Sequence, residues 1–327
     1  MVFLLIAVVA AALFFDFTNG FHDAANAIAT SISTRALSPG SALAMAAALN
    51  VIGGLLSTTV AATIATGIVV PHAVTLPILL AGLVGAISWN LLTWYFGIPS
   101  SSSHCLIGGL AGAVAVDFGL AGVQWMGIVE KVLIPTIVSP LLGFFVGAGL
   151  AVAVGWIFRR SNPRRTQMIF RKAQLISAAA MALSHGLNDA QKTMGVITLA
   201  LFASGSIAAP EVPLWVKLCC AVAIGLGTAI GGKRIIRTLG MGIVKMSPAD
   251  GFCAQTGASL VMQAAAWFGA PISTTHVATT TIMGVGSAHR VRAVRWGVTR
   301  SIVVAWILTL PASAAIGGLL AWVLHLF

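Results

Sequence analysis

The segment SHGLNDAQKTMG, residues 184–195, places an aspartate, a lysine, a histidine and an asparagine in the middle of a chain that is otherwise strongly apolar. Of the 327 residues, 58% are hydrophobic and 8% are charged, whereas soluble domains carry about 25% charged residues. The chain is therefore expected to be a membrane protein. An unpaired charge inside a membrane costs about 2.5–3.5 kcal/mol or more, so this segment is expected to serve a function or to hold the fold together.

Long apolar runs predict several membrane-spanning helices. About 20 apolar residues in a helix cross a hydrocarbon core of about 30 Å. The runs that meet this requirement are residues 41–65, 76–96, 132–157, 214–232 and 301–324. The first residues, Met1 to Ala12, are also apolar, but they have no basic start and no polar cleavage region. We expect them to belong to the first span rather than to a signal peptide.

The charged residues and the cysteines argue against several other classes of protein. The net charge is +11, but the basic residues cluster between apolar runs, which is typical of orientation signals rather than of nucleic-acid binding. The sequence has no H-E-x-x-H motif and no nucleophile elbow, so we expect no enzyme activity, no metal site and no cofactor. The cysteines lack metal-ligand spacing, and we expect free buried thiols at Cys105, Cys219, Cys220 and Cys253.

The two halves of the chain repeat one another in three ordered places. GFHDAANAIA at 20–29 aligns with GLNDAQKTMG at 186–195, FGIPSSSSH at 96–104 with FGAPISTTH at 268–276, and VQW at 123–125 with VRW at 294–296. These matches predict an internal duplication, with a first repeat at 1–157 and a second at 173–327. The hydrophilic segment between them, residues 158–172, is expected to be a connecting loop.

Basic residues in short loops mark the cytoplasmic side of a membrane protein, and here they change sides between the repeats. The segments 66–75 and 117–127 carry no lysine or arginine, whereas their counterparts at 233–245 and 288–300 carry four each. The repeats are therefore predicted to be inverted in the membrane, with the linker in the cytoplasm and both termini outside. Inverted repeats are an architecture of secondary transporters, whose substrate site lies near the bilayer midplane between the repeats.

An aspartate lies in each of the first matched segments, at Asp23 and Asp189. Each is flanked by glycine, asparagine and hydroxyl residues that interrupt or cap helices. We therefore expect a broken helix at residues 20–26 and another at 186–192. Ionisable residues inside a membrane usually mark substrate or ion pathways, so both carboxylates are expected to bind something. The alternative is a polar clasp that only holds the repeats together.

A proline followed by hydroxyl side chains makes the second matched pair. Such a stretch is typical of the start of a helix, where the first amides lack partners. Two helix starts that face each other would bind an oxyanion, and ordinary helix capping is the alternative. The hydroxyls concerned are Ser101, Ser102 and Ser103 in the first repeat and Ser273, Thr274 and Thr275 in the second. His104 and His276, which follow them, are expected to brace the turn.

These motifs, with TWYFGIPSSSSH at 93–104 and APISTTHV at 270–277, resemble the paired signature motifs of the bacterial inorganic phosphate transporter (PiT) family. The resemblance covers both halves of the chain in order. It implies an all-α polytopic membrane protein with two inverted-topology repeats, broken helices and re-entrant helical hairpins, located in the cell membrane. It also implies that the protein imports inorganic phosphate by cation symport.

The resemblance further implies which residues bind. The implied phosphate ligands are Asp23, Asn26, Ser101, Ser102, Ser103, Asp189, Lys192, Ser273, Thr274 and Thr275, and the implied coupling-ion residues are His22, Asp23, Asn188 and Asp189. Sodium-coupled members read Gly-Ala-Asn-Asp where residues 20–23 of this chain read Gly-Phe-His-Asp. The histidine resembles the proton-coupled bacterial members, so we expect proton coupling. The lysine would attract the anion, and the acidic neighbours would make binding depend on a cation.

Several alternatives stay open. The coupling ion could be sodium, a divalent metal could travel with phosphate, and the scaffold could carry sulfate or another oxyanion. Phosphate is favoured because it can donate a hydrogen bond to Asp23 or Asp189, whereas sulfate at neutral pH cannot. A passive channel is a further alternative, which uptake against a gradient would exclude. The expected partners are inorganic phosphate, a proton or sodium ion and the lipid bilayer; the pattern is compatible with a homodimer.

Overall fold

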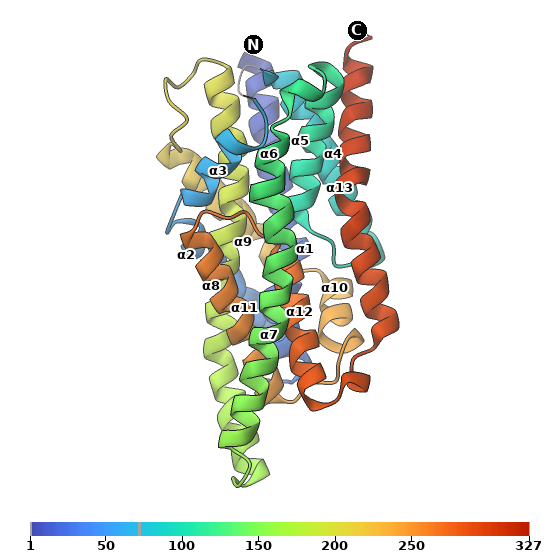
Figure 1. The fold of residues 1–327 in the computed structure, drawn as a ribbon. Coiled ribbons are helices and arrows are strands. Elements are labelled where there is room, and N and C mark those ends of the chain that lie inside the picture. Colours follow the sequence, from blue (N-terminus) through green and yellow to red (C-terminus); the bar gives the residue numbers. More distant parts are fainter. Residues whose placement is uncertain (1, 71–72, 327) are drawn as a thin grey trace.

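The computed structural model describes residues 2–70 and 73–326, and helices make up most of that part of the chain. They stand side by side in one bundle (Figure 1). In chain order they are α1 (Val2–Ser33), α2 (Pro39–Gly54), α3 (Thr59–Gly67), α4 (Leu76–Phe96), α5 (Ser102–Asp117), α6 (Trp125–Ile128), α7 (Ile134–Ile157), α8 (Pro163–Ala203), α9 (Leu214–Ile230), α10 (Lys233–Arg237), α11 (Pro248–Trp267), α12 (Thr274–His289) and α13 (Trp296–Leu324). The predicted all-α fold class is confirmed.

Among the described residues, four helical segments are long and apolar enough to cross a membrane: α1, α4, the run Trp125–Ile157 that contains α6 and α7, and α13. Two further helix pairs meet this requirement together and are bent at a short break. The bend is 68° between α2 and α3, and 65° between α9 and the segment Lys233–Gly242. Counting each pair as one span gives up to six spans. Broken helices, which the resemblance to the phosphate transporter motifs implies, are therefore present at these two places.

The breaks do not lie at the aspartate motifs, where the sequence predicts them. α1 runs without interruption through Asp23, and α8 runs without interruption through Asp189. The glycines of these motifs allow close helix packing instead. A Cβ atom on Gly20 would overlap the backbone of α9, and one on Gly186 would overlap the backbone of α2. The expectation of broken helices at 20–26 and 186–192 is wrong because these glycines make room for a neighbouring helix.

The same order of elements occurs in both halves of the chain. α1 corresponds to α8, the bent pair α2 and α3 to α9 and α10, the pair α4 and α5 to α11 and α12, and the long helix α7 to α13. The last helix of each half packs against the other half, with α13 on α5 and α7 on α12. The two halves are thus interlocked. The boundaries of the repeats and their inversion stay predictions.

Much of the hydrophilic linker is helical. α8 begins at Pro163, so the loop after α7 is confined to residues 158–162. The Asn162 side chain caps α8 by accepting a hydrogen bond of 3.0 Å from the Arg164 amide, and proline is favoured at the first position of a helix. The connecting loop expected at 158–172 is therefore shorter, and its later basic residues belong to α8.

Both ends of the chain lie at one end of the bundle, and the loop at 158–162 lies at the opposite end (Figure 1). An antiparallel β-bridge joins Val69 to Val123, so the two segments without basic residues meet. The two basic segments also meet, because the Arg295 amide donates a hydrogen bond of 2.9 Å to the Ile243 carbonyl. The segments predicted to lie on the same side of the membrane thus lie next to each other in the fold. Which end of the bundle faces the cytoplasm stays a prediction.

The four cysteines are free, as the sequence predicts, but Cys219 is exposed rather than buried. It lies next to the buried Cys220 on α9. Adjacent positions on a helix point in different directions, so one thiol faces the core while its neighbour faces outward.

Candidate functional site

The two aspartate motifs meet inside the bundle. α1 carries Asp23 and packs against α8, which carries Asp189. Both carboxylates are buried. One oxygen from each, together with a ring nitrogen of His185, lie within 4.8 Å of one another. Carboxylate and imidazole groups are ordinary metal ligands, so these three residues could hold a metal ion.

The helix pairs α4–α5 and α11–α12 are called the two hairpins. Asp23 contacts the second helix of each hairpin. The Ser102 hydroxyl, in the first turn of α5, donates a hydrogen bond of 3.0 Å to the Oδ2 atom of Asp23. The Thr275 hydroxyl, in the first turn of α12, donates one of 3.2 Å to the Oδ1 atom. A single carboxylate therefore links two helix N-termini that come from opposite halves of the chain.

Asp189 is held by three side chains. It forms an ion pair with Lys192, one turn further along α8. Its Oδ2 atom accepts a hydrogen bond of 3.0 Å from the Thr274 hydroxyl and lies 3.1 Å from Nε2 of His185. A buried charge needs such partners because its removal from water is costly.

Lys192 and Asn26 occupy matching positions in the two motifs, and both reach the hairpins. The Lys192 ammonium donates hydrogen bonds of 2.5 Å to the Ser103 hydroxyl and 3.0 Å to the Ile272 carbonyl. The Asn26 amide donates one of 2.9 Å to the Thr275 hydroxyl. These contacts hold the first turns of α5 and α12 against α1 and α8.

Ser101 and Ser273 cap the two hairpin helices. Their side-chain oxygens accept hydrogen bonds of 3.2 Å from the backbone amides of His104 and His276, respectively. For these two serines the capping alternative holds. The hydroxyls that follow them contact the carboxylates or Lys192, and the first amides of a helix have no partner within the helix. The site thus combines hydroxyl, ammonium and amide donors around two carboxylates.

His22 connects Asp23 to a pair of hydroxyls. Its Nδ1 atom lies 2.7 Å from the Oδ1 atom of Asp23. Its Nε2 atom lies 3.2 Å from the Thr93 hydroxyl and 3.3 Å from the Ser100 hydroxyl. A hydroxyl can either donate or accept a hydrogen bond, so these neighbours suit the imidazole both in its neutral and in its protonated form.

Asn188 points toward a different helix. Its amide donates hydrogen bonds of 2.9 Å to the Ser184 carbonyl and 3.1 Å to the Met262 carbonyl. These contacts direct the side chain to α11 rather than to the two carboxylates. The structure therefore brings together the predicted site residues except Asn188, with Ser101 and Ser273 at the edge as caps.

His104 and His276 pack against each other behind the caps. Their ring centroids are 4.9 Å apart. His104 Nε2 lies 2.8 Å from the Thr136 hydroxyl, and the His276 ring centroid lies 4.0 Å from that of Trp306. Both side chains contact helices that flank the hairpins. Neither ring nitrogen of His276 has a hydrogen-bond partner among the described residues, so its role as a brace stays a prediction.

The sequence reasoning missed three polar residues beside the site, which are His185, Asn90 and Thr93. His185 precedes Asp189 by four positions, a spacing that puts both on one face of a helix. Asn90 accepts a hydrogen bond of 3.3 Å from the Ser102 hydroxyl. Asn90 and Thr93 both interrupt an apolar run, and such polar residues inside a spanning helix are the signal that could have found them.

The charges of Asp23, Asp189 and Lys192 sum to minus one when the nearby histidines are neutral. An oxyanion bound to the hydroxyl, amide and ammonium donors would add negative charge close to both carboxylates. Charges at such short distances interact strongly away from bulk water. Anion binding at this site would therefore be stronger when a cation binds with it.

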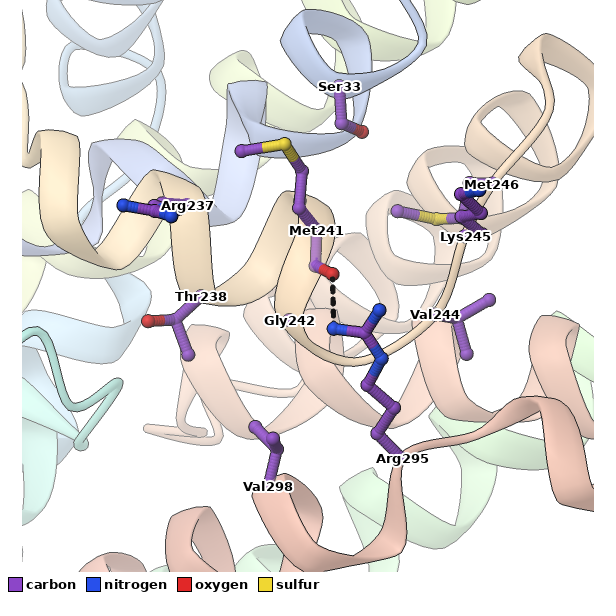
Figure 2. Close-up of a pocket in the computed structure, with 11 residues that line it drawn as sticks. Ser33, Arg237, Thr238, Met241, Gly242, Val244, Lys245, Met246, Arg295 and Val298 are labelled. Carbon is purple, nitrogen blue, oxygen red and sulfur yellow. Dashed lines mark hydrogen bonds between the residues drawn. The ribbon is translucent and has the colours of Figure 1, made fainter.

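A cavity of about 590 Å³ lies elsewhere in the bundle, beside the turn Thr238–Gly242. Figure 2 shows the basic side chains of Arg237, Lys245 and Arg295 around it, with the Arg295 guanidinium donating a hydrogen bond of 3.4 Å to the Met241 carbonyl. Its lining contains none of the predicted site residues. Its basic lining residues lie in the segments 233–245 and 288–300, which are predicted to be cytoplasmic.

Comparison with known proteins gives matches along nearly the whole chain. Residues 19–317 match the model of the phosphate transporter family. The chain is 50% identical over 328 residues to the "Probable low-affinity inorganic phosphate transporter" of Mycobacterium bovis, covering 99% of this chain and 78% of that protein. A protein of the same name from Bacillus subtilis is 44% identical, covering 100% of this chain and 98% of its own length.

A solved structure described as "The sodium-dependent phosphate transporter" has the same fold. Its TM-score is 0.91, and the match covers 99% of each chain. The two sequences are 24% identical, so this likeness supports the architecture of the bundle alone.

Proposed function

The chain belongs to the phosphate transporter family, and on this premise we propose that it imports inorganic phosphate across the cell membrane by symport with protons. The observation that carries the proposal is the meeting of Ser102 and Thr275 at the carboxylate of Asp23, at 3.0 and 3.2 Å. It brings the N-termini of α5 and α12, one from each half of the chain, close together inside the bundle, and helix N-termini are sites where anions bind.

Phosphate suits this site because the site offers both donors and acceptors. Hydroxyls and the Lys192 ammonium can donate to phosphate oxygens. Asp23 and Asp189 can accept a hydrogen bond from a protonated phosphate oxygen. Sulfate at neutral pH has no proton to donate, so its oxygens would face these carboxylates without compensation.

Symport follows from the charge of the site. Two carboxylates and one ammonium leave it with a charge of minus one, and phosphate brings one to two more negative charges. A cation that binds with phosphate reduces this repulsion. Phosphate and the cation then favour each other's binding by the same factor, which is how a gradient of one can drive the other.

Protons are the proposed coupling ion because His22 lies 2.7 Å from Asp23. Imidazole exchanges protons near neutral pH more readily than other side chains. The hydroxyls of Thr93 and Ser100 near its second nitrogen can serve either protonation state. His22 can therefore gain and lose a proton without leaving a buried polar atom unpaired.

Transport of phosphate together with a divalent metal is a second candidate. It is favoured by the group Asp23, His185 and Asp189, which offers three ligand atoms within 4.8 Å of one another. In this form the metal is part of the cargo, and the carboxylates bind the metal while the hydroxyls and Lys192 bind the phosphate.

The test is uptake of radiolabelled phosphate into proteoliposomes, with pH, sodium and magnesium gradients imposed one at a time. We expect accumulation driven by an inward proton gradient without sodium. The variant His22→Asn should lose most of the response to pH while it keeps phosphate binding. The matched control is His325→Asn, whose ring is half-exposed near the end of the chain and should behave as the wild type.

A sodium requirement in the wild type would contradict proton coupling, as would a full response to pH in His22→Asn. A requirement for magnesium would favour the metal-phosphate form. Failure to accumulate phosphate under any gradient would refute symport itself.

A further inference from the structure

Asp16 is a buried acidic residue that the proposed mechanism does not use. It lies on α1, seven residues before Asp23, and its side chain has no exposed surface. Neither of its carboxylate oxygens has a hydrogen-bond partner among the residues that the structure describes. Asp23 and Asp189, by contrast, each have several partners.

Two more oxygens without partners belong to residues close to Asp16 in the fold. The Thr193 hydroxyl, on α8, lies near the Asp16 carboxylate and has no hydrogen-bond partner among the described residues. The Asn19 side-chain oxygen, one turn after Asp16 on α1, also lacks a described partner. All three side chains are buried. Their unpaired atoms are oxygens, the atoms that bind protons and hard cations.

The charged and titratable groups near Asp16 do not neutralise it. Asp189 and Lys192, both on α8, interact electrostatically with Asp16. The Lys192 ammonium, however, is already paired with Asp189. Cys220 faces it from α9 and carries no positive charge as a thiol. On α1 itself the nearest titratable groups are His22 and Asp23, which contact each other.

Asp16 continues a polar stripe that contains the proposed phosphate site. Asp16, Asn19, Asp23 and Asn26 are spaced by three, four and three residues, so they lie on one face of α1. Seven residues of helix separate Asp16 from Asp23 by about 10 Å. Asp16 lies on the side of Asp23 toward the N-terminus of α1, and therefore toward the end of the bundle that holds both chain termini (Figure 1).

An ionised carboxylate buried without partners is strongly unfavourable. A positive charge at Asp16 removes this penalty, either as a proton on the carboxyl group or as a monovalent metal ion coordinated by the oxygens of Asp16, Asn19 and Thr193. We propose that Asp16, with Asn19 and Thr193, forms a second site for the coupling cation, separate from the phosphate site and nearer the end of the bundle that holds both chain termini. This inference rests on the proposed symport.

Asp16→Asn tests the proposal, because it keeps the shape of the side chain and removes its charge. A gradient of one pH unit, or a tenfold sodium gradient, drives at most about tenfold accumulation for each ion coupled. We expect wild-type proteoliposomes to accumulate phosphate under one of the two gradients. Under the same gradient, Asp16→Asn should accumulate about tenfold less phosphate than the wild type. Because the Asp16→Asn side chain carries no charge, the variant resembles the cation-occupied state; its affinity for phosphate, measured with radiolabelled phosphate on the purified protein at a saturating concentration of the driving cation, should stay within about threefold of the wild type.

Two further variants sharpen the test. Asp16→Glu keeps the carboxylate and should recover part of the accumulation. Asp117→Asn removes a partly exposed carboxylate and should accumulate phosphate as the wild type does. The gradient that drives the wild type identifies the cation, a proton if it is the pH gradient and sodium if it is the sodium gradient.

Full accumulation by Asp16→Asn would overturn the proposal and leave symport intact. Loss of phosphate affinity together with accumulation would overturn the claim that the two sites are separate. A wild type that accumulates phosphate under neither gradient would refute the proposed symport, and the inference about Asp16 with it.

Discussion

The ion pair between Asp189 and Lys192 should dominate the stability of the site, and a double-mutant cycle can measure it. Both side chains are buried. Removing one partner of a buried ion pair costs about 3–5 kcal/mol, because the other charge is left without compensation. The variants are Asp189→Asn, Lys192→Met and the double variant.

The two single variants should differ in cost. Asp189→Asn leaves the Lys192 ammonium with the Ser103 hydroxyl and the Ile272 carbonyl, which carry no full charge, so we expect a loss near the upper limit of about 5 kcal/mol. Lys192→Met leaves Asp189 with the Thr274 hydroxyl at 3.0 Å and His185 at 3.1 Å. We expect that loss to be near the lower limit of about 3 kcal/mol.

The double variant should be more stable than either single variant. It removes both charges together, and replacing a buried pair by uncharged groups is often nearly neutral. We expect it to lie within about 2 kcal/mol of the wild type, rather than about 8 kcal/mol below it as independent effects would give.

The assay is the free energy of unfolding in mixed lipid and detergent micelles, measured by denaturant titration. The control is the pair Asp117 and His325, which is partly exposed and should contribute less than about 1 kcal/mol. Additive losses for Asp189→Asn and Lys192→Met would refute the buried ion pair. A larger loss of stability for Lys192→Met than for Asp189→Asn would refute the argument that Asp189, once alone, keeps better partners than Lys192 does.

The remaining predictions concern the site and the topology. Asp23→Asn should abolish gradient-driven uptake while the protein still inserts into the membrane, and near-normal uptake would show that the carboxylate is structural. Thr275→Val removes the hydroxyl that joins Asp23 to α12 and should weaken phosphate binding by about tenfold, the value of one hydrogen bond, in an equilibrium binding assay. Sulfate should compete at least about 100-fold less well than phosphate in the same assay, because it cannot donate to the carboxylates. In a Cys219→Ser background, an impermeant thiol reagent added outside whole cells should label Thr66→Cys but not Lys245→Cys, and labelling of both from one side would contradict the inverted repeats.

The repeated motifs made most of the site predictable from the sequence. Asp23 and Asp189 stand out because each lies in a copy of one motif, and the hydroxyls of Ser102 and Thr275 lie in copies of another. A residue that recurs at matching places in an inverted duplication is expected near the interface of the repeats. The structure brings these four residues together.

The course of the helices was harder to predict. Gly20 and Gly186 occur where a helix break would need them, but in the structure they let another helix approach closely. Both uses require a residue without a side chain. The local sequence does not separate them, because the neighbouring helix comes from a distant part of the chain.

Asp16 was missed because it has no matching aspartate in the second half of the chain. The offset that aligns Asp23 with Asp189 places Ala182 opposite Asp16, so a search for matching residues passes over it. Its burial and its unpaired oxygens depend on α8 and α9, which only tertiary structure brings to it.

The central claim is that phosphate binds where the two hairpins meet the two aspartate motifs, and an experimental structure of the protein in lipid nanodiscs with phosphate tests it most directly. We predict tetrahedral density within hydrogen-bond distance of the Lys192 ammonium and of hydroxyls from the first turns of α5 and α12, in a cryo-EM map that lacks this density when phosphate is omitted. Phosphate density found only in the basic cavity around Arg237 and Lys245, with the contacts of Lys192 unchanged, would contradict it.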